Sequence, residues 1–460
     1  MKNLKNSNIF HLILFTILFV GCNKDELNLN PISSIGDSGF YNTDAEIEGA
    51  VIAIYDGLQE IPKSEFALTE MRSDNTKSKI GQGDIGEFEE YRILPTNFYV
   101  STYWKDNYNV IFRANRVLKN LDVVSNDLKK SQFEGEAKFS RALAHFNLVN
   151  AFGDVPILDK EVNFTDPDFS DYLDRDTAND VISFIVLDLT EAISLLPSRG
   201  EIEDGRATSG AASALLAKVY LTQKNYNGAR ALLETLISDS NYGLVEDYKD
   251  VFYSEQNKEI IFAIGYKDDN ASEGQNFSLE FTLQGGTAYN FLEDNFRGDV
   301  DVLDTERSAV LFNPNDQFTI GKYIPTSSNI RLAGNDWIVL RLADIYLMHA
   351  EAIMAGSNST IDLNALNSFN AIRLRVGLST IPLDGSGLLT KEMLLHERRI
   401  ELAFENHRFN DLVRFGKAIE ILTAHANSKG DVFEETDLLN PIPQNEINIS
   451  RGLLLQNIGY

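Results

Sequence analysis

Apolar side chains recur every three or four residues over most of this chain. That spacing places apolar side chains on one face of an α-helix. The segments that show it are 46–58, 103–121, 134–152, 177–196, 211–224, 227–238, 337–354, 363–376 and 391–424. The pattern therefore predicts an all-α, mainly helical body.

The helical pattern lapses in two places, near 71–103 and near 240–335, where Gly, Asn, Asp and aromatic residues are mixed. Such composition is typical of loops and turns. Within the second segment, Glu-Ile-Ile-Phe-Ala-Ile-Gly at 259–265 is a short apolar run and predicts a strand. We therefore expect a helical body over 44–460 that carries two loop-rich insertions and a few short strands.

One pair of predicted helices has the spacing of a tetratricopeptide unit. Small Ala217 and Ala229 would let two antiparallel helices approach closely, and Tyr220 and Leu233 would fill the groove between them. Other predicted pairs show looser versions of the same spacing. The pattern predicts a scaffold of tetratricopeptide-like helix pairs.

The N-terminus has the build of a secretory signal. Lysines precede an apolar run at 9–20, which ends at Gly21-Cys22. Such a run is too short to cross a bilayer core of about 30 Å, so we interpret 1–21 as a signal peptide. Cys22, the only cysteine, follows a small residue and resembles the lipidated cysteine of a bacterial lipobox. The alternative is an ordinary cleaved signal followed by a chance cysteine.

Residues 22–43 are polar and contain Pro31, so we expect them to form a tether that leads into the body. Lys24-Asp25-Glu26, just after the cysteine, resembles the surface-export signal of Bacteroidetes lipoproteins. A lipid on Cys22 would hold the chain on a membrane without a spanning helix.

Composition narrows the function classes. The 460 residues are 43% hydrophobic, and 41 Lys+Arg against 68 Asp+Glu give a formal net charge of −27. Apolar content on this scale indicates a packed core rather than a disordered chain. The acidic balance argues against a nucleic-acid partner, because phosphate binding needs clustered Lys and Arg. One cysteine excludes an internal disulfide and a cysteine-based zinc or iron–sulfur site.

Candidate catalytic residues are scarce. Glu397, Glu401 and Glu405 share one helical face, and paired carboxylates can hydrolyse glycosides. We favour ion pairing of these acids with the interleaved arginines, which are Arg398, Arg399, Arg408 and Arg414. The histidines lack H-E-x-x-H spacing, and His145 and His349 have the apolar neighbours of core residues. The sequence therefore predicts no catalytic residue, no metal site and no cofactor.

Motifs spread over the whole chain resemble the SusD/RagB nutrient-binding lipoproteins of Bacteroidetes outer membranes. They are Tyr103-Trp104 with Ala114-Asn115, Glu136-Ala137 with Arg141-Ala142 and Phe152-Gly153-Asp154-Val155-Pro156, Gly205-Arg206-Ala207-Thr208, the runs 341–352 and 370–378, Glu397-Arg398-Arg399 through Arg414, and the ending at 441–460. The resemblance implies a tetratricopeptide-like scaffold with a loop-rich ligand-binding face. It also implies a lipid-anchored, cell-surface protein of the outer membrane that captures a nutrient, with an oligosaccharide as the expected ligand, for a SusC-type TonB-dependent transporter and catalyses no reaction.

The two loop-rich segments supply candidate ligand contacts, because sugars are bound by aromatic faces flanked by Asn, Asp and Arg side chains. The candidates are Arg72, Asp74, Asn75, Tyr91, Tyr99, Tyr289, Asn290, Phe291, Phe296 and Arg297. The alternative for each aromatic residue is an anchor that fixes its loop to the core. Two other functions are kept as alternatives, a tetratricopeptide adaptor that binds only protein and a surface glycosidase.

Overall fold

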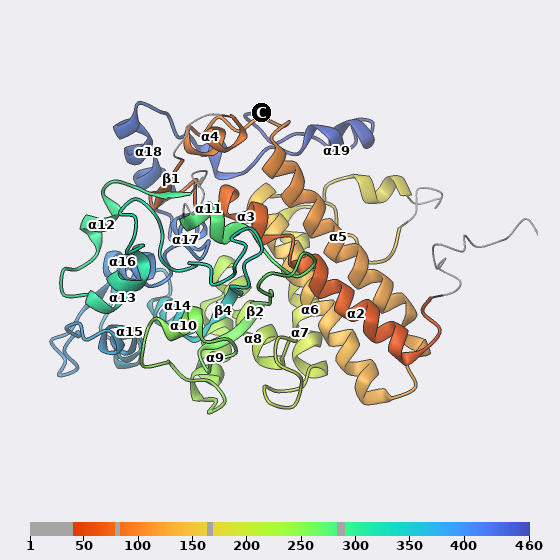
Figure 1. The fold of residues 1–460 in the computed structure, drawn as a ribbon, viewed down its shortest axis with the longest axis horizontal. Helices are drawn as coiled ribbons and strands as arrows, with labels where there is room; N and C mark the ends of the chain where they lie inside the picture. Colours follow the sequence, from red (N-terminus) through yellow and green to blue (C-terminus); the bar gives the residue numbers. More distant parts are fainter. Residues whose placement is uncertain (1–39, 79–82, 163–168, 283–289) are drawn as a thin grey trace, which may run out of the picture.

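The computed structural model describes residues 40–78, 83–162, 169–282 and 290–460 (Figure 1). Most of these residues are helical, which confirms the all-α prediction. Cys22, the signal peptide at 1–21, the tether up to residue 39 and Tyr289 lie outside the described residues. No helix within the described ranges is both long and apolar enough to cross a membrane.

The longest helices come first in the described chain. The α-helices are α2 (Asp44–Leu58), α3 (Pro62–Leu68), α4 (Gly83–Glu89), α5 (Phe98–Asn120), α6 (Asp127–Phe152), α7 (Ala178–Leu195), α8 (Ser209–Thr222), α9 (Tyr226–Ser238), α10 (Asp250–Tyr253), α11 (Phe277–Thr282), α12 (Phe296–Asp299), α13 (Thr305–Leu311), α14 (Leu342–Met354), α15 (Leu363–Arg375), α16 (Lys391–Glu401), α17 (Arg408–Arg414), α18 (Ala418–Lys429) and α19 (Gln444–Ile449). Short 3-10 helices are η3 (Leu121–Val123), η4 (Phe169–Leu173) and η5 (Glu435–Leu438).

The strands of the described chain form two-stranded antiparallel sheets. The pairs are β1 (Thr76–Lys77) with β3 (Phe291–Leu292), β2 (Ile260–Ile264) with β4 (Trp337–Arg341), and β5 (Ser359–Thr360) with β6 (Leu389–Thr390). The β2–β4 pair is buried in the core, with Ile264 opposite Trp337. The strand predicted at 259–265 is therefore confirmed.

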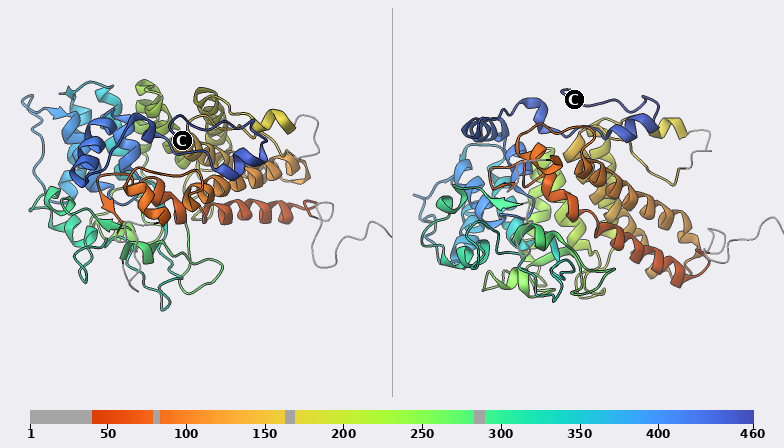
Figure 2. Two further views of the ribbon diagram at one scale, coloured as in Figure 1. Left: turned by 90° about the horizontal axis from the view of Figure 1, so that it is seen from above. Right: turned by 45° about the horizontal axis from the view of Figure 1, so that its top comes forward.

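α2, α5, α6 and α7 lie side by side as a layer of long helices (Figures 1 and 2). Capping side chains determine where they begin. Asn97 Oδ1 accepts hydrogen bonds from the backbone N–H groups of Tyr99 and Val100, at 3.0 and 3.3 Å, at the start of α5. Thr177 and Thr208 cap α7 and α8 in the same way. Such caps satisfy first-turn N–H groups that have no partner within the helix.

α8 packs against α9 as the predicted tetratricopeptide-like pair. Ala217, Ala229 and Leu233 are fully buried, and Tyr220 is half-buried. The fit is tight, because a Cβ on Gly228 would lie 2.9 Å from the Tyr220 ring. α9 also packs against α14, and α14 against α15, so helix pairing continues along the chain.

Two helix boundaries differ from the sequence prediction. Residues 337–341 have helical spacing, yet they form β4 because their backbone pairs with β2. The segment 391–424 is not one helix but belongs to α16, α17 and α18. The breaks coincide with left-handed backbone at Asn406 (φ 62°) and Gly416 (φ 70°), a conformation that ends helices.

The two histidines predicted as core residues are buried, as expected. His145 on α6 is fully buried, and its ring meets that of Phe184 with centroids 5.2 Å apart. Its Nδ1 lies 2.9 Å from the carbonyl oxygen of Arg141. Burial lowers the pKa of His145 from 6.5 to about 3, because a charged imidazolium would be desolvated there. His349 is buried beside Ser368, 2.8 Å from its hydroxyl.

Candidate functional site

The two loop-rich segments meet at the β1–β3 sheet. Thr76 pairs with Leu292 and Lys77 with Phe291, and the N–H of Glu293 donates to the carbonyl of Asn75 at 2.9 Å. α4 and the start of α5 lie beyond β1, and the turn at 313–320 lies beside β3. We call this surface the loop face and define it as residues 76–78, 83–99, 290–299 and 313–320. It lies near α11 and α12 in Figure 1.

Buried ion pairs hold the loop face from below. The guanidinium of Arg399 donates to Asn75 Oδ1 at 2.8 Å, to the Asp74 carbonyl at 2.7 Å and to Asp299 Oδ2 at 2.6 Å. Arg408 pairs with both carboxylate oxygens of Asp74. Burial alone would raise the pKa of Asp74, but hydrogen bonds and charge from Arg408 and Arg399 outweigh it and hold that pKa well below its usual range.

Arg72 and Tyr91 link the loop face to the C-terminal part of the chain. Arg72 is 1% exposed, its guanidinium lies 4.1 Å from the centre of the Phe409 ring, and it donates to the carbonyl of Asp437. The Tyr91 hydroxyl donates to the carbonyl of Arg72 at 3.4 Å, and its ring packs on Phe433. Both side chains therefore make their contacts inside the protein.

The candidates of the second segment differ in exposure. Asn290, Phe291 and Phe296 are buried, and Phe296 packs beneath Arg399 with 5.3 Å between guanidinium and ring centre. Arg297 is exposed, lies 3.8 Å from the centre of the Phe312 ring and donates to the carbonyl of Gln317 at 2.8 Å. Of all the described candidates, Arg297 and half-buried Tyr99 are the ones that reach solvent.

Two aromatic residues outside the candidate set are open to solvent on the loop face. Phe98, the first residue of α5, is 61% exposed, and Phe318 is 53% exposed. Ring contacts connect them through the interior, from Phe98 to Tyr99 at 5.5 Å, to Phe66 at 5.9 Å and to Phe281 at 5.6 Å. The carbonyl of Phe281 then accepts from the N–H of Ile320 at 3.1 Å, two residues after Phe318. Sequence pattern alone does not separate these rings from buried neighbours.

The acidic row on α16 and just beyond it is buried and ion-paired. Glu397, Glu401 and Glu405 are at most 4% exposed. Their partners are not the interleaved arginines, so that part of the expectation is wrong. The partners come from elements that pack across the row, and they are Arg307, Arg341, Arg373, Arg375 and Lys322.

The interleaved arginines lie on other helix faces and form ion pairs with other acidic residues. Arg398 pairs with Asp344 and Asp411, each at 2.8 Å, and Arg414 pairs with Glu351 at 2.8 Å. These pairs join α16 and α17 to α14 and, through Asp411, join α16 to α17. Over the described ranges, no group of three or more His, Cys, Asp or Glu side chains is placed to hold a metal ion.

Two family profiles match different parts of this sequence. One, described as the SusD family, matches residues 304–460. The other, described as "Starch-binding associating with outer membrane", matches residues 28–221. A curated relative, "SusD-like protein P2" of Formosa agariphila, is 27% identical, and the match covers 97% of this chain and 98% of the relative.

Solved structures share the fold. A laminarin-binding SusD-like protein is 28% identical with a TM-score of 0.75, over 91% of this chain and 100% of that one. Surface glycan-binding protein A from Bacteroides thetaiotaomicron, solved with laminarihexaose, is 24% identical with a TM-score of 0.77, over 90% of this chain and 99% of that one. At this identity, the second likeness concerns the fold alone.

Proposed function

Because this chain belongs to the SusD/RagB family, we propose that it captures a glycan at the cell surface and delivers it to a SusC-type TonB-dependent transporter. The similarity to a laminarin-binding relative supports a glycan as the ligand class. The loop face supports it from the geometry, because the exposed rings of Phe98 and Phe318 stand there beside polar side chains. These two rings are the observation on which the proposal mainly rests.

Exposed rings on a firm support suit sugar binding. An aromatic ring offers a flat apolar face to the C–H groups of a pyranose, and neighbouring polar groups can bind its hydroxyls. We propose Phe98, Tyr99, Arg297 and Phe318 as the ligand contacts. The buried candidates act from beneath by holding the loops in place, which lowers the entropy lost on binding. They are Arg72, Asp74, Asn75, Tyr91, Asn290, Phe291 and Phe296.

The N-terminal segment supplies the location in this proposal. A lipid on Cys22 would anchor the protein in the outer membrane, exposed on the cell surface. The polar tether at 22–43 would let the body move over the transporter while ligand is handed on. No membrane-spanning helix is needed for such an anchor.

The same proposal assigns no catalysis to the chain. The carboxylates of Glu397, Glu401 and Glu405 are buried, and each is paired with a guanidinium or an ammonium group. A polysaccharide cannot reach them, so they serve as links between helices. New reducing ends after incubation of the purified protein with laminarin or starch would contradict this assignment.

Isothermal titration calorimetry against a glycan panel that includes laminarin oligosaccharides tests the function. We expect one glycan class to bind, and Phe98→Ala and Phe318→Ala each to weaken that binding by about tenfold or more, as for aromatic residues central to an interface. Phe112→Ala is the matched control, because Phe112 is 40% exposed but lies on α5 away from the loop face. Equal losses in all three variants would contradict the loop face as the site. Absence of binding to every glycan would favour the alternative function, a protein-binding adaptor.

A further inference from the structure

A second concave site lies between the helical scaffold and the C-terminal half of the chain. This cleft has a volume of about 970 Å³ and is bordered by α6 and α8 on one side and by β4 and α17 on the other. None of the candidate ligand residues lines it, and neither do Phe98 and Phe318. The cleft is therefore separate from the loop face.

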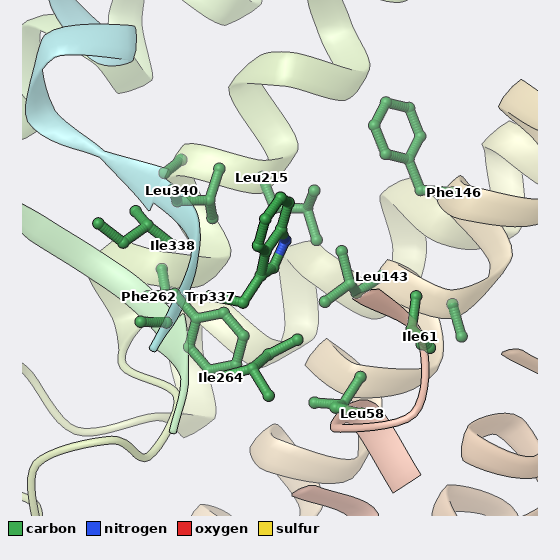
Figure 3. Packing of buried hydrophobic residues seen from close by; sticks show 14 of the residues in the cluster. Leu58, Ile61, Leu143, Phe146, Leu215, Phe262, Ile264, Trp337, Ile338 and Leu340 are labelled. Atoms are coloured by element: carbon green, nitrogen blue, oxygen red, sulfur yellow. The ribbon is translucent and has the colours of Figure 1, made fainter. Parts of the chain in front are cut away.

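The deep part of the cleft has an apolar wall. Figure 3 shows the indole ring of Trp337 standing among aliphatic side chains that come from different elements. They are Leu58, Ile61, Leu143, Leu215 and Ile264, and each is at most 6% exposed. The volume lies within the range of about 300–1,000 Å³ that small-molecule sites usually have. An apolar molecular body can therefore be enclosed here.

Polar groups with unused hydrogen-bonding capacity border the same cleft. Asn406 is 6% exposed, and its Nδ2 donates to Glu65 at 2.9 Å, while its Oδ1 accepts no hydrogen bond from the described residues. The indole N–H of Trp337 likewise donates to no group within the described ranges. A buried polar atom left unpaired destabilises the protein, so a ligand that donates to Asn406 Oδ1 would gain binding energy.

Several charged groups that line the cleft are paired within the protein. Lys218 pairs with Asp344 at 3.1 Å, Arg414 with Glu351 at 2.8 Å, and Glu405 with Arg341. Burial, followed by the charge of Lys218, lowers the pKa of His407 to about 3, so that its ring is neutral at physiological pH. Beside these paired groups, an ionic ligand would lose its hydration without meeting an unpaired counter-charge, and a neutral ligand avoids that cost.

We propose that this cleft is a second binding site, for a neutral amphipathic molecule with an aliphatic or aromatic body and an amide head. The body packs on the leucine and isoleucine wall. The amide head suits this site because its N–H can donate to Asn406 Oδ1. This site is additional to the proposed glycan capture and does not depend on it.

Trp337 is one of only two tryptophans, which makes the cleft directly observable. Bromoundecanamide carries an amide head, an alkyl body and a bromine that quenches tryptophan fluorescence on contact. In Trp104→Phe, where only Trp337 emits, we expect saturable quenching that unbrominated undecanamide reverses. In Trp337→Phe, where only Trp104 emits, we expect little quenching. Absence of saturable quenching in Trp104→Phe, or no recovery with the unbrominated amide, would overturn the proposal.

A cavity-filling variant tests the location. Leu143→Phe adds volume at the wall, and we expect it to raise the apparent Kd for bromoundecanamide by about tenfold. Leu187→Phe is the matched control, because Leu187 is 55% exposed on α7 outside the cleft. Equal binding by both folded variants would show surface partitioning and overturn the site. Phe98→Ala should leave the quenching unchanged, which separates this result from failure of the glycan proposal.

Discussion

The guanidinium of Arg408 donates to both carboxylate oxygens of Asp74, at 2.7 and 2.8 Å, although the two residues are 334 positions apart. Both side chains are buried, and Arg399 approaches the same carboxylate to 3.5 Å. The pair fixes the start of the loop face to α17. Removing one partner would leave a buried charge uncompensated, which destabilises a protein far more than replacing both partners by apolar residues.

We expect Asp74→Asn to lower the free energy of unfolding by about 3–5 kcal/mol, because Arg408 loses its counter-charge. Urea unfolding followed by circular dichroism measures this change. Asp294→Asn is the control, because the Asp294 side chain is 82% exposed where it pairs with Lys77, and such a surface pair contributes about 1 kcal/mol or less. Similar losses of stability in the two variants would contradict this role of the Asp74–Arg408 ion pair.

His145 should make the protein less stable in mild acid. Its pKa is about 3 in the folded state against 6.5 for a free imidazole, so between these values the unfolded chain binds the extra proton. Stability therefore falls as the pH drops through that window, by at most about 1.4 kcal/mol per pH unit from this residue. Between about pH 6 and pH 4, we expect His145→Phe to reduce the slope of the free energy of unfolding against pH. An unchanged slope would exclude His145 as a source.

Ala217→Trp should disrupt the α8–α9 pair. Ala217 has no exposed surface, so a large ring would force the helices apart at a cost of about 1–3 kcal/mol or more. The melting temperature from a thermal scan reports the loss. Ala231→Trp is the matched control, because Ala231 lies on the exposed face of α9. A normal melting temperature for Ala217→Trp would refute the tight pairing.

Cys22→Ala should release the protein from the membrane fraction, because the lipid attachment point is lost. Fractionation of cells that express the wild type and the variant, followed by immunoblotting, compares the two. Ser33→Ala, a change in the same polar segment, should leave the protein membrane-bound. A variant that stays in the membrane fraction would place the anchor elsewhere.

Local spacing predicted the parts of the fold that depend on local contacts. Ala217 and Ala229 indicated a close helix pair, and the structure buries both. The same spacing misassigned 337–341, because pairing with β2, far away in sequence, overrides helical periodicity. Helical spacing also could not predict the ion-pair partners of Glu401. Arg341 and Arg375 belong to β4 and α15, and they contact Glu401 only in the folded chain.

At the candidate site, too, the local sequence indicates some features, whereas others depend on the folded chain. Composition identified the two segments that form the loop face, but it could not rank the side chains within them. Phe98 and Tyr99 are adjacent, yet one ring is 61% exposed and the other is half-buried against Phe66. Exposure depends on how α5 is capped and packed, and that is a property of the assembled structure.

The contact between Asp74 and Arg408 also sets an order of events during synthesis. The ribosome makes the long helices and the first loop segment well before α16 and α17 emerge. Those helices can pair early through neighbouring contacts, whereas the loop face lacks its clamping arginines until the last part of the chain is present. A chain cut short by premature termination would therefore keep much of its helical content and lose the surface proposed to recognise ligand.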